Sequence, residues 1–150
     1  MEYLEKVFSK DNDVHELYIQ KVGKYELDFP KIYEPLDKSI GVYIIKVRGV
    51  VRKVGKFEGT WNKRVSRYRS VCNILEDIVT GKRARPENGH FLTPFKLYEN
   101  MEVGESAQVI IRFFGNIERQ PDGEPISTNV AQVERELKVL YSERDDLWLI

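Results

Sequence analysis

The sequence predicts an α+β fold in which a small mixed central sheet of about three strands is flanked by helices. Segments rich in β-branched residues lie at 41–47, 50–54 and 109–114, and each has the length of a strand. Apolar residues recur at spacings of three and four at 61–80 and again at 129–141, which is typical of amphipathic helices. Strands that alternate with helical segments favour a sheet covered by helices.

A length of 150 residues predicts a single domain, 1–150, with an N-terminal extension at 1–40 and a core at 41–141. No apolar run approaches the roughly 20 residues that a membrane span needs, so no membrane partner is expected. The N-terminal residues lack the pattern of a secretory signal, and the lone Cys72 has no disulfide partner. We therefore expect a cytoplasmic protein.

The first half of the chain predicts two hairpins. Residues 14–29 alternate apolar and polar side chains on both sides of Val22-Gly23, which indicates a hairpin in the extension. The strand 41–47 is followed by a turn at Arg48-Gly49 and by a second strand that we expect to end at Gly55.

The second half predicts the helices and a third strand. Thr60 is the expected N-cap of a helix over 61–80, and Gly81 is its expected stop. Pro94 is expected at the first position of a short helix that runs to Met101. After the strand 109–114 and a turn at 122–125, a capping box of Asn129 and Gln132 opens a final helix to about Tyr141. Trp61, Tyr68 and Cys72 are expected to pack in the core.

The formal net charge is zero, but the charge is unevenly distributed. Between Lys46 and Arg85 there are twelve basic and three acidic residues, a net charge of +9, whereas residues 1–45 carry −3 and residues 86–150 carry −6. Such a basic region is either a solvated face or a phosphate-binding surface. Charge alone does not separate the two.

Three features occur in a suggestive order along the chain. Gly41-Val42-Tyr43 lies on one predicted strand, and Lys53-Val54-Gly55 ends the next. Arg64 follows Gly55 by nine residues on the first helix, and Glu134 lies on the last helix. This order resembles the GIY-YIG nucleases, whose two tripeptides, helical arginine and metal-binding glutamate come in the same succession. The resemblance covers roughly 41–141 and is greatest to compact restriction-type or phage-encoded endonucleases.

The resemblance implies a magnesium-dependent endonuclease acting on double-stranded DNA. Lys53 stands where most members have a second tyrosine, so either Lys53, with a depressed pKa, or Tyr43 is the general base. Arg64 is permanently charged and forked, which suits it to the scissile phosphate. Glu134 would bind Mg²⁺, or another divalent ion such as Mn²⁺. Further phosphate contacts are expected from Lys56, Lys63, Arg67 and Arg69.

Several alternatives stay open at this point. Glu134 and Glu136 flank the apolar stripe of the last helix. We favour Glu134 because Leu137 follows it by three residues, which resembles the Glu-x-x-Leu pattern of the GIY-YIG nucleases. His90 is left outside the site as a loop histidine. A non-cleaving nucleic-acid-binding module on the same scaffold is the alternative function. Cutting both strands makes a homo-oligomer plausible.

Overall fold

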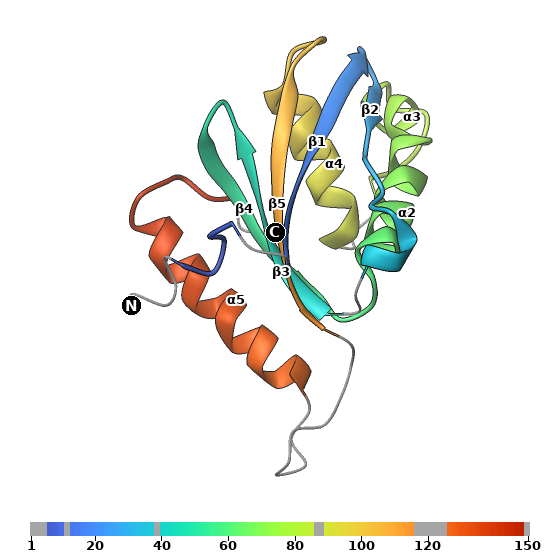
Figure 1. Ribbon diagram of the computed structural model, residues 1–150. Helices are drawn as coiled ribbons and strands as arrows, with labels where there is room; N and C mark the ends of the chain where they lie inside the picture. Colours follow the sequence, from blue (N-terminus) through green and yellow to red (C-terminus); the bar gives the residue numbers. More distant parts are fainter. Residues whose placement is uncertain (1–5, 11–12, 38–39, 86–88, 116–125, 149–150) are drawn as a thin grey trace.

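The computed structural model of the protein describes residues 6–10, 13–37, 40–85, 89–115 and 126–148. Within these residues, five strands form one sheet in the order β2-β1-β5-β3-β4 (Figure 1), and every pair of neighbours is antiparallel. The strands are β1 (Val14–Gly23), β2 (Glu26–Asp28), β3 (Ile40–Val47), β4 (Val50–Phe57) and β5 (Ser106–Gly115). The helices are η1 (Glu34–Leu36), α2 (Trp61–Cys72), α3 (Leu75–Val79), α4 (Gly89–Asn100) and α5 (Ile126–Ser142).

The α+β class is confirmed, but the prediction of a mixed sheet of about three strands was wrong. The predicted N-terminal hairpin exists as β1 and β2, and it extends the same sheet because β1 pairs along β5, from Val14 opposite Arg112 to Gln20 opposite Ser106. The third predicted strand, β5, therefore lies at the centre, between β1 and β3. Alternation on β1 places Ile19 in the core, and the backbone pairing of β1 gives β5 a second partner.

The β3–β4 hairpin turns at Arg48 and Gly49, whose φ angles of 50° and 78° are those of the two-residue turn that matches strand twist. The predicted end of the second strand at Gly55 was wrong, because β4 continues to Phe57. Gly55 is instead paired with Tyr43 across the hairpin. Ile45 is paired with Lys53, and the register shifts between Ile45 and Lys46.

The predicted helix 61–80 is divided into α2 and α3. Thr60 is its N-cap as predicted and accepts a hydrogen bond from the Lys63 amide, and Gly81 follows with a φ of 81°. The helix is interrupted because Ile74 donates its amide to Val71 three residues back, so the regular four-residue hydrogen bonding ends there.

The starts predicted for the two later helices were also wrong. α4 begins at Gly89, so Pro94 lies inside the helix, and α5 begins at Ile126, so Asn129 is not its N-cap. Gln132 instead donates to Glu136, one turn later. The turn predicted at 122–125 lies outside the described residues.

The sheet separates two hydrophobic cores. α5 covers one face over β3 and β4, and α2, α3 and α4 cover the other (Figure 1). Trp61 and Tyr68 are buried as predicted, and Cys72 is half-buried against the same core. Across the described ranges, no helix is both long and apolar enough to cross a bilayer. The edge strand β4 thus has helices packed on both of its sides.

Candidate active site

The four residues of the predicted catalytic set come from four different elements and meet around β4. Tyr43 lies on β3, Lys53 on β4, Arg64 on α2 and Glu134 on α5. The charges of Arg64 and Glu134 both act on the Tyr43 hydroxyl and on the Lys53 amine, so each of these two groups lies within electrostatic reach of Arg64 and of Glu134. The structure therefore brings together residues that are up to 91 positions apart in the sequence.

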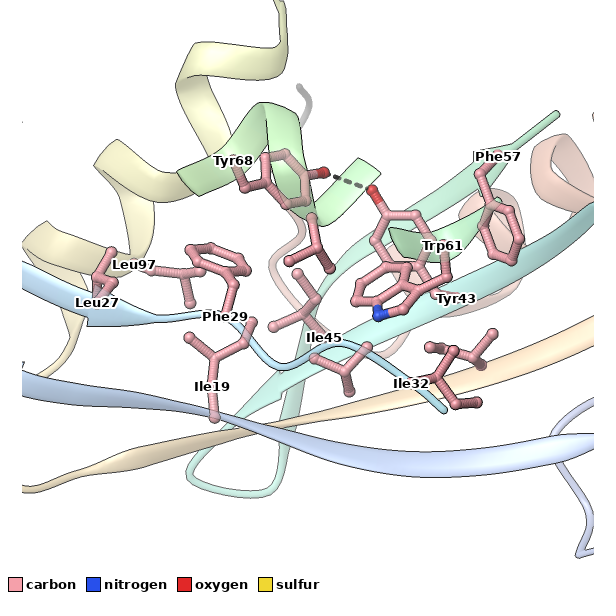
Figure 2. Packing of buried hydrophobic residues seen from close by; sticks show 14 of the residues in the cluster. Ile19, Leu27, Phe29, Ile32, Tyr43, Ile45, Phe57, Trp61, Tyr68 and Leu97 are labelled. Carbon is pink, nitrogen blue, oxygen red and sulfur yellow. Dashed lines mark hydrogen bonds between the residues drawn. The ribbon is translucent and has the colours of Figure 1, made fainter. Parts of the chain in front are cut away.

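The Tyr43 side chain is buried, with 1% of its surface exposed. Its hydroxyl oxygen lies 2.7 Å from the hydroxyl oxygen of Tyr68, and Figure 2 shows the two groups pointing toward each other. Burial, followed by the proximity of Tyr68, raises the pKa of Tyr43 well above its usual value. Tyr43 therefore stays protonated at physiological pH and donates or accepts a hydrogen bond as a neutral group.

The two glycines of the paired tripeptides make room for aromatic rings. A Cβ atom built on Gly55 would lie 2.5 Å from the Tyr43 hydroxyl oxygen and 2.6 Å from its Cε1. A Cβ atom on Gly41 would lie 2.5 Å from the Arg112 carbonyl oxygen and 2.5 Å from Cζ of Phe57. Glycine is needed at both positions because any side chain would overlap these neighbours.

Lys53 is a buried cation, with 6% of its surface exposed. Burial is the main reason that its pKa falls from 10.5 to about 8, and the charges of Arg64 and Lys138 lower it further. The charge of Glu134 raises the pKa of Lys53 and so limits the decrease. An amine with a pKa near 8 is partly neutral at physiological pH, so it can accept a proton.

Arg64 is half-buried at the boundary between α2 and the end of β4. Its Nη2 donates to the Lys56 carbonyl oxygen at 3.1 Å, which ties the helix to the strand. A hollow of about 50 Å³ opens beside it. The residues that line the hollow are Phe57, Gly59, Thr60, Lys63, Arg64 and Arg67. Three of them are cations, so the hollow has the charge that a phosphate oxygen requires.

The remaining predicted phosphate contacts have different surroundings. Lys63 and Arg67 are exposed on α2. The Nζ of Lys56 lies 2.8 Å from a carboxylate oxygen of Glu58. Arg69 donates from Nε and Nη2 to the Phe29 carbonyl oxygen at 3.1 and 2.7 Å, so it anchors the chain before η1 to the helix.

The two glutamates of α5 differ in what they touch. Glu134 lies 3.7 Å from Lys138, and its charge acts on Tyr43 and Lys53. Glu136 accepts from Gln132 at 3.2 Å through Oε1, and its charge is not among those that act on either residue. Of the two glutamates, only Glu134 acts on both Tyr43 and Lys53.

The donor set fits a hydrated Mg²⁺ better than a metal held by protein ligands alone. Among the described residues, no three His, Cys, Asp or Glu side chains gather closely enough to hold a metal ion. Mg²⁺ prefers carboxylate oxygen and keeps several of its waters, so a single carboxylate next to a phosphate suffices. The Glu134 side chain has 15% of its surface exposed and can reach such an ion.

Two residues near the site were missed by the sequence analysis. Tyr68 was expected to pack in the core, with a contact to sugar or base as the alternative, yet its hydroxyl is the hydrogen-bond partner of Tyr43. A buried tyrosine hydroxyl needs a partner, and its place four residues after Arg64, on the same side of the helix, was the available signal. Lys138, on α5, lowers the pKa of Lys53, and no sequence pattern indicates this effect.

Comparison with known proteins gives one likeness of fold. No protein-family model matches the chain, and no curated protein matches it in sequence. A solved structure described as the restriction endonuclease HPY188I in complex with product DNA is similar to it. The match covers 96% of this chain and 87% of that chain, with 18% sequence identity and a TM-score of 0.47.

Proposed function

We propose that this protein is a GIY-YIG endonuclease that hydrolyses phosphodiester bonds of double-stranded DNA with the help of Mg²⁺. The observation that carries the proposal is the burial of Lys53 within electrostatic reach of Arg64 and Glu134, whose charges also act on Tyr43. A buried cation lowers the stability of a fold, so its presence beside other titratable groups is a mark of a functional site. The family in this proposal is supported by the resemblance of the two tripeptides, Arg64 and Glu134 to the motifs of the GIY-YIG nucleases.

In this proposal Lys53 is the general base. Phosphodiester hydrolysis requires a group that takes a proton from the attacking water. Lys53, with a pKa of about 8, is suited to this step, whereas the raised pKa of Tyr43 makes its phenolate scarce. Tyr43, held by Tyr68, instead orients the water through its neutral hydroxyl.

Arg64 binds the scissile phosphate in this proposal. Its charge does not depend on pH, and charge builds up on the phosphate oxygens as the transition state forms. The hydrogen bond from Arg64 to the Lys56 carbonyl oxygen ties the guanidinium to β4, the strand that carries Lys53, so the base and the phosphate-binding group are held by the same strand. This preorganisation lowers the cost of reaching the transition state.

Glu134 would hold the metal ion. Bound Mg²⁺ supplies positive charge for the phosphate and the departing 3′ oxygen. Lys56, Lys63, Arg67 and Arg69 would contact neighbouring phosphates, which accounts for the charge of +9 over residues 46–85. Because Arg69 also anchors Phe29, we assign it the smallest share of DNA binding.

Replacing Arg64 with alanine tests the proposal directly. We expect purified protein to convert supercoiled plasmid to nicked and linear forms in Mg²⁺ and to be inactive in EDTA. Arg64→Ala should cleave about 10²–10³-fold more slowly, because one transition-state donor is lost. Arg135→Ala is the matched control, since it removes an exposed arginine from α5.

The outcomes separate the two functions that the sequence left open. Cleavage that is strongly slowed in Arg64→Ala and unchanged in Arg135→Ala supports a nuclease. If the wild-type protein binds plasmid but leaves it intact in Mg²⁺, the protein is a non-cleaving DNA-binding module and the proposal is wrong.

A further inference from the structure

We propose that Tyr33, on the segment from Phe29 to Asp37, is a DNA-contacting residue that binds the duplex on the far side of α2 from Arg64. This inference rests on the proposed function, because it takes double-stranded DNA as the partner. It adds a contact surface that is separate from the four residues around Lys53.

The segment 29–37 is attached to α2 by side-chain hydrogen bonds along its length. The Asn62 amide group accepts from the Ile32 amide and donates to the Ile32 carbonyl oxygen, both at 2.9 Å. The Asp37 carboxylate accepts from the first two amides of α2, those of Trp61 and Asn62, at 2.9 and 3.0 Å. The chain between Ile32 and Asp37 is therefore fixed at both ends on the same helix.

Between these two attachments the chain forms η1 and turns Tyr33 outward. The Leu36 amide donates to the Tyr33 carbonyl oxygen at 2.8 Å, and Pro35 restricts the backbone inside the turn. Tyr33 is 72% exposed, more than any other large hydrophobic residue described, and Leu36 is 47% exposed. A rigid turn thus presents an aromatic ring that no part of the described fold covers.

The charges around Tyr33 favour a nucleic acid as the partner. Lys31 on the segment and Lys63 and Arg67 on α2 are exposed cations, against the exposed Glu34 and the half-buried Asp37 of the segment. An aromatic ring among lysines and arginines is the combination that binds DNA, because the cations meet phosphates while the ring contacts sugar or base.

The two sides of α2 are close enough to share one duplex. At 100° per residue, Arg64 lies about 200° around the helix from Asn62, so the segment and Arg64 flank α2 on opposite sides. The helix is about 10–12 Å across, which is close to the 12 Å width of the DNA major groove. DNA that places a phosphate at Arg64 can therefore reach Tyr33 across the exposed cations of α2.

The test is the affinity of each variant for a random-sequence DNA duplex, measured by fluorescence anisotropy in EDTA so that no cleavage occurs. We expect Tyr33→Ala to bind about tenfold more weakly and Tyr33→Phe to bind like the wild type, since the ring supplies the contact. Tyr18→Ala is the matched control. Tyr18 is another exposed tyrosine, at 52%, but it lies on β1, away from α2.

Salt dependence distinguishes loss of a ring from loss of a charge. Tyr33→Ala should leave the slope of log K against log salt unchanged, whereas Lys63→Ala should reduce it by about one. Thermal unfolding of Tyr33→Ala should match the wild type, because the ring is exposed.

An unchanged affinity for Tyr33→Ala overturns this inference and leaves the nuclease proposal standing, provided that the wild-type protein cleaves plasmid in Mg²⁺. A loss shared equally by Tyr18→Ala overturns it as well. If the wild-type protein neither binds nor cleaves DNA, both proposals fail.

Discussion

Lys53→Met is expected to make the protein more stable and to slow its cleavage of DNA at the same time. Methionine is about as long as lysine and apolar, so it fills the same space without a buried charge. Folding lowers the pKa of Lys53 from 10.5 to about 8. Removing the charge should therefore raise the free energy of unfolding at pH 7 by up to about 3 kcal/mol. Urea denaturation of the wild type and of Lys53→Met measures this difference.

The pH dependence of that gain follows from the sign of the shift. The folded state releases its Lys53 proton near pH 8 and the unfolded state near 10.5, so the unfolded state binds more protons in between. The destabilisation by Lys53 is complete below about pH 8 and decreases as the pH rises toward 10.5. The stability difference between Lys53→Met and the wild type should therefore narrow over this window. If Lys53→Met and the wild type had equal stability at pH 7, the prediction that Lys53 is a destabilising buried charge would be wrong.

Cleavage by the same variants tests the role of Lys53 as the base. Lys53→Met should cleave DNA about 10²–10⁴-fold more slowly, which is the range for loss of a general base. Lys53→Arg keeps the positive charge but does not give up its proton, so it should be equally inactive. If Lys53→Arg retained most of the activity, Lys53 would be an electrostatic clamp instead.

Gly55→Ala is expected to cost about 3 kcal/mol or more of folding stability and to reduce cleavage at least about a hundredfold. The new methyl group would overlap the Tyr43 ring across the β3–β4 hairpin. The ring is buried and hydrogen-bonded to Tyr68, so it has little room to move, and overpacking a core in this way is destabilising. Displacing the Tyr43 hydroxyl would also spoil the alignment of the site.

Gly59→Ala is the matched control for stability. A Cβ atom at Gly59 would meet only Cδ of Lys63, at 3.5 Å, which is an ordinary contact. The substitution also reduces the freedom of the unfolded chain, so we expect unchanged or slightly higher stability. Equal losses in the two variants would show that the approach of Tyr43 to Gly55 is not the cause.

The strands and helices that carry the candidate site could be predicted from local patterns. Thr60 and Gly81 marked the start and stop correctly because capping depends on neighbouring residues. The size of the sheet could not be predicted in this way. It depends on the pairing of β1 with β5, some 90 residues apart in the sequence, which no local pattern encodes.

The residue types of the site were also visible in the sequence, but their states were not. The tripeptides indicated Tyr43 and Gly55. Glycine is required at position 55 because the Tyr43 ring lies against it, and this contact follows from the register of the β3–β4 hairpin. The sequence left the base open between Tyr43 and Lys53. Burial raises the pKa of Tyr43, which makes it a poor general base, and lowers the pKa of Lys53, which makes it a better one. Burial is a property of the whole fold and is not visible in a local pattern.

The most direct test of the account is plasmid cleavage over a range of Mg²⁺ concentrations by the wild type, Glu134→Gln and Glu136→Gln. Glutamine keeps the shape of each side chain and removes its charge. We predict that Glu134→Gln loses about 10²–10³-fold in rate, whereas Glu136→Gln stays within a few-fold of the wild type. Cleavage by Glu134→Gln at the wild-type rate, or loss of activity in Glu136→Gln alone, would contradict the site described around Lys53.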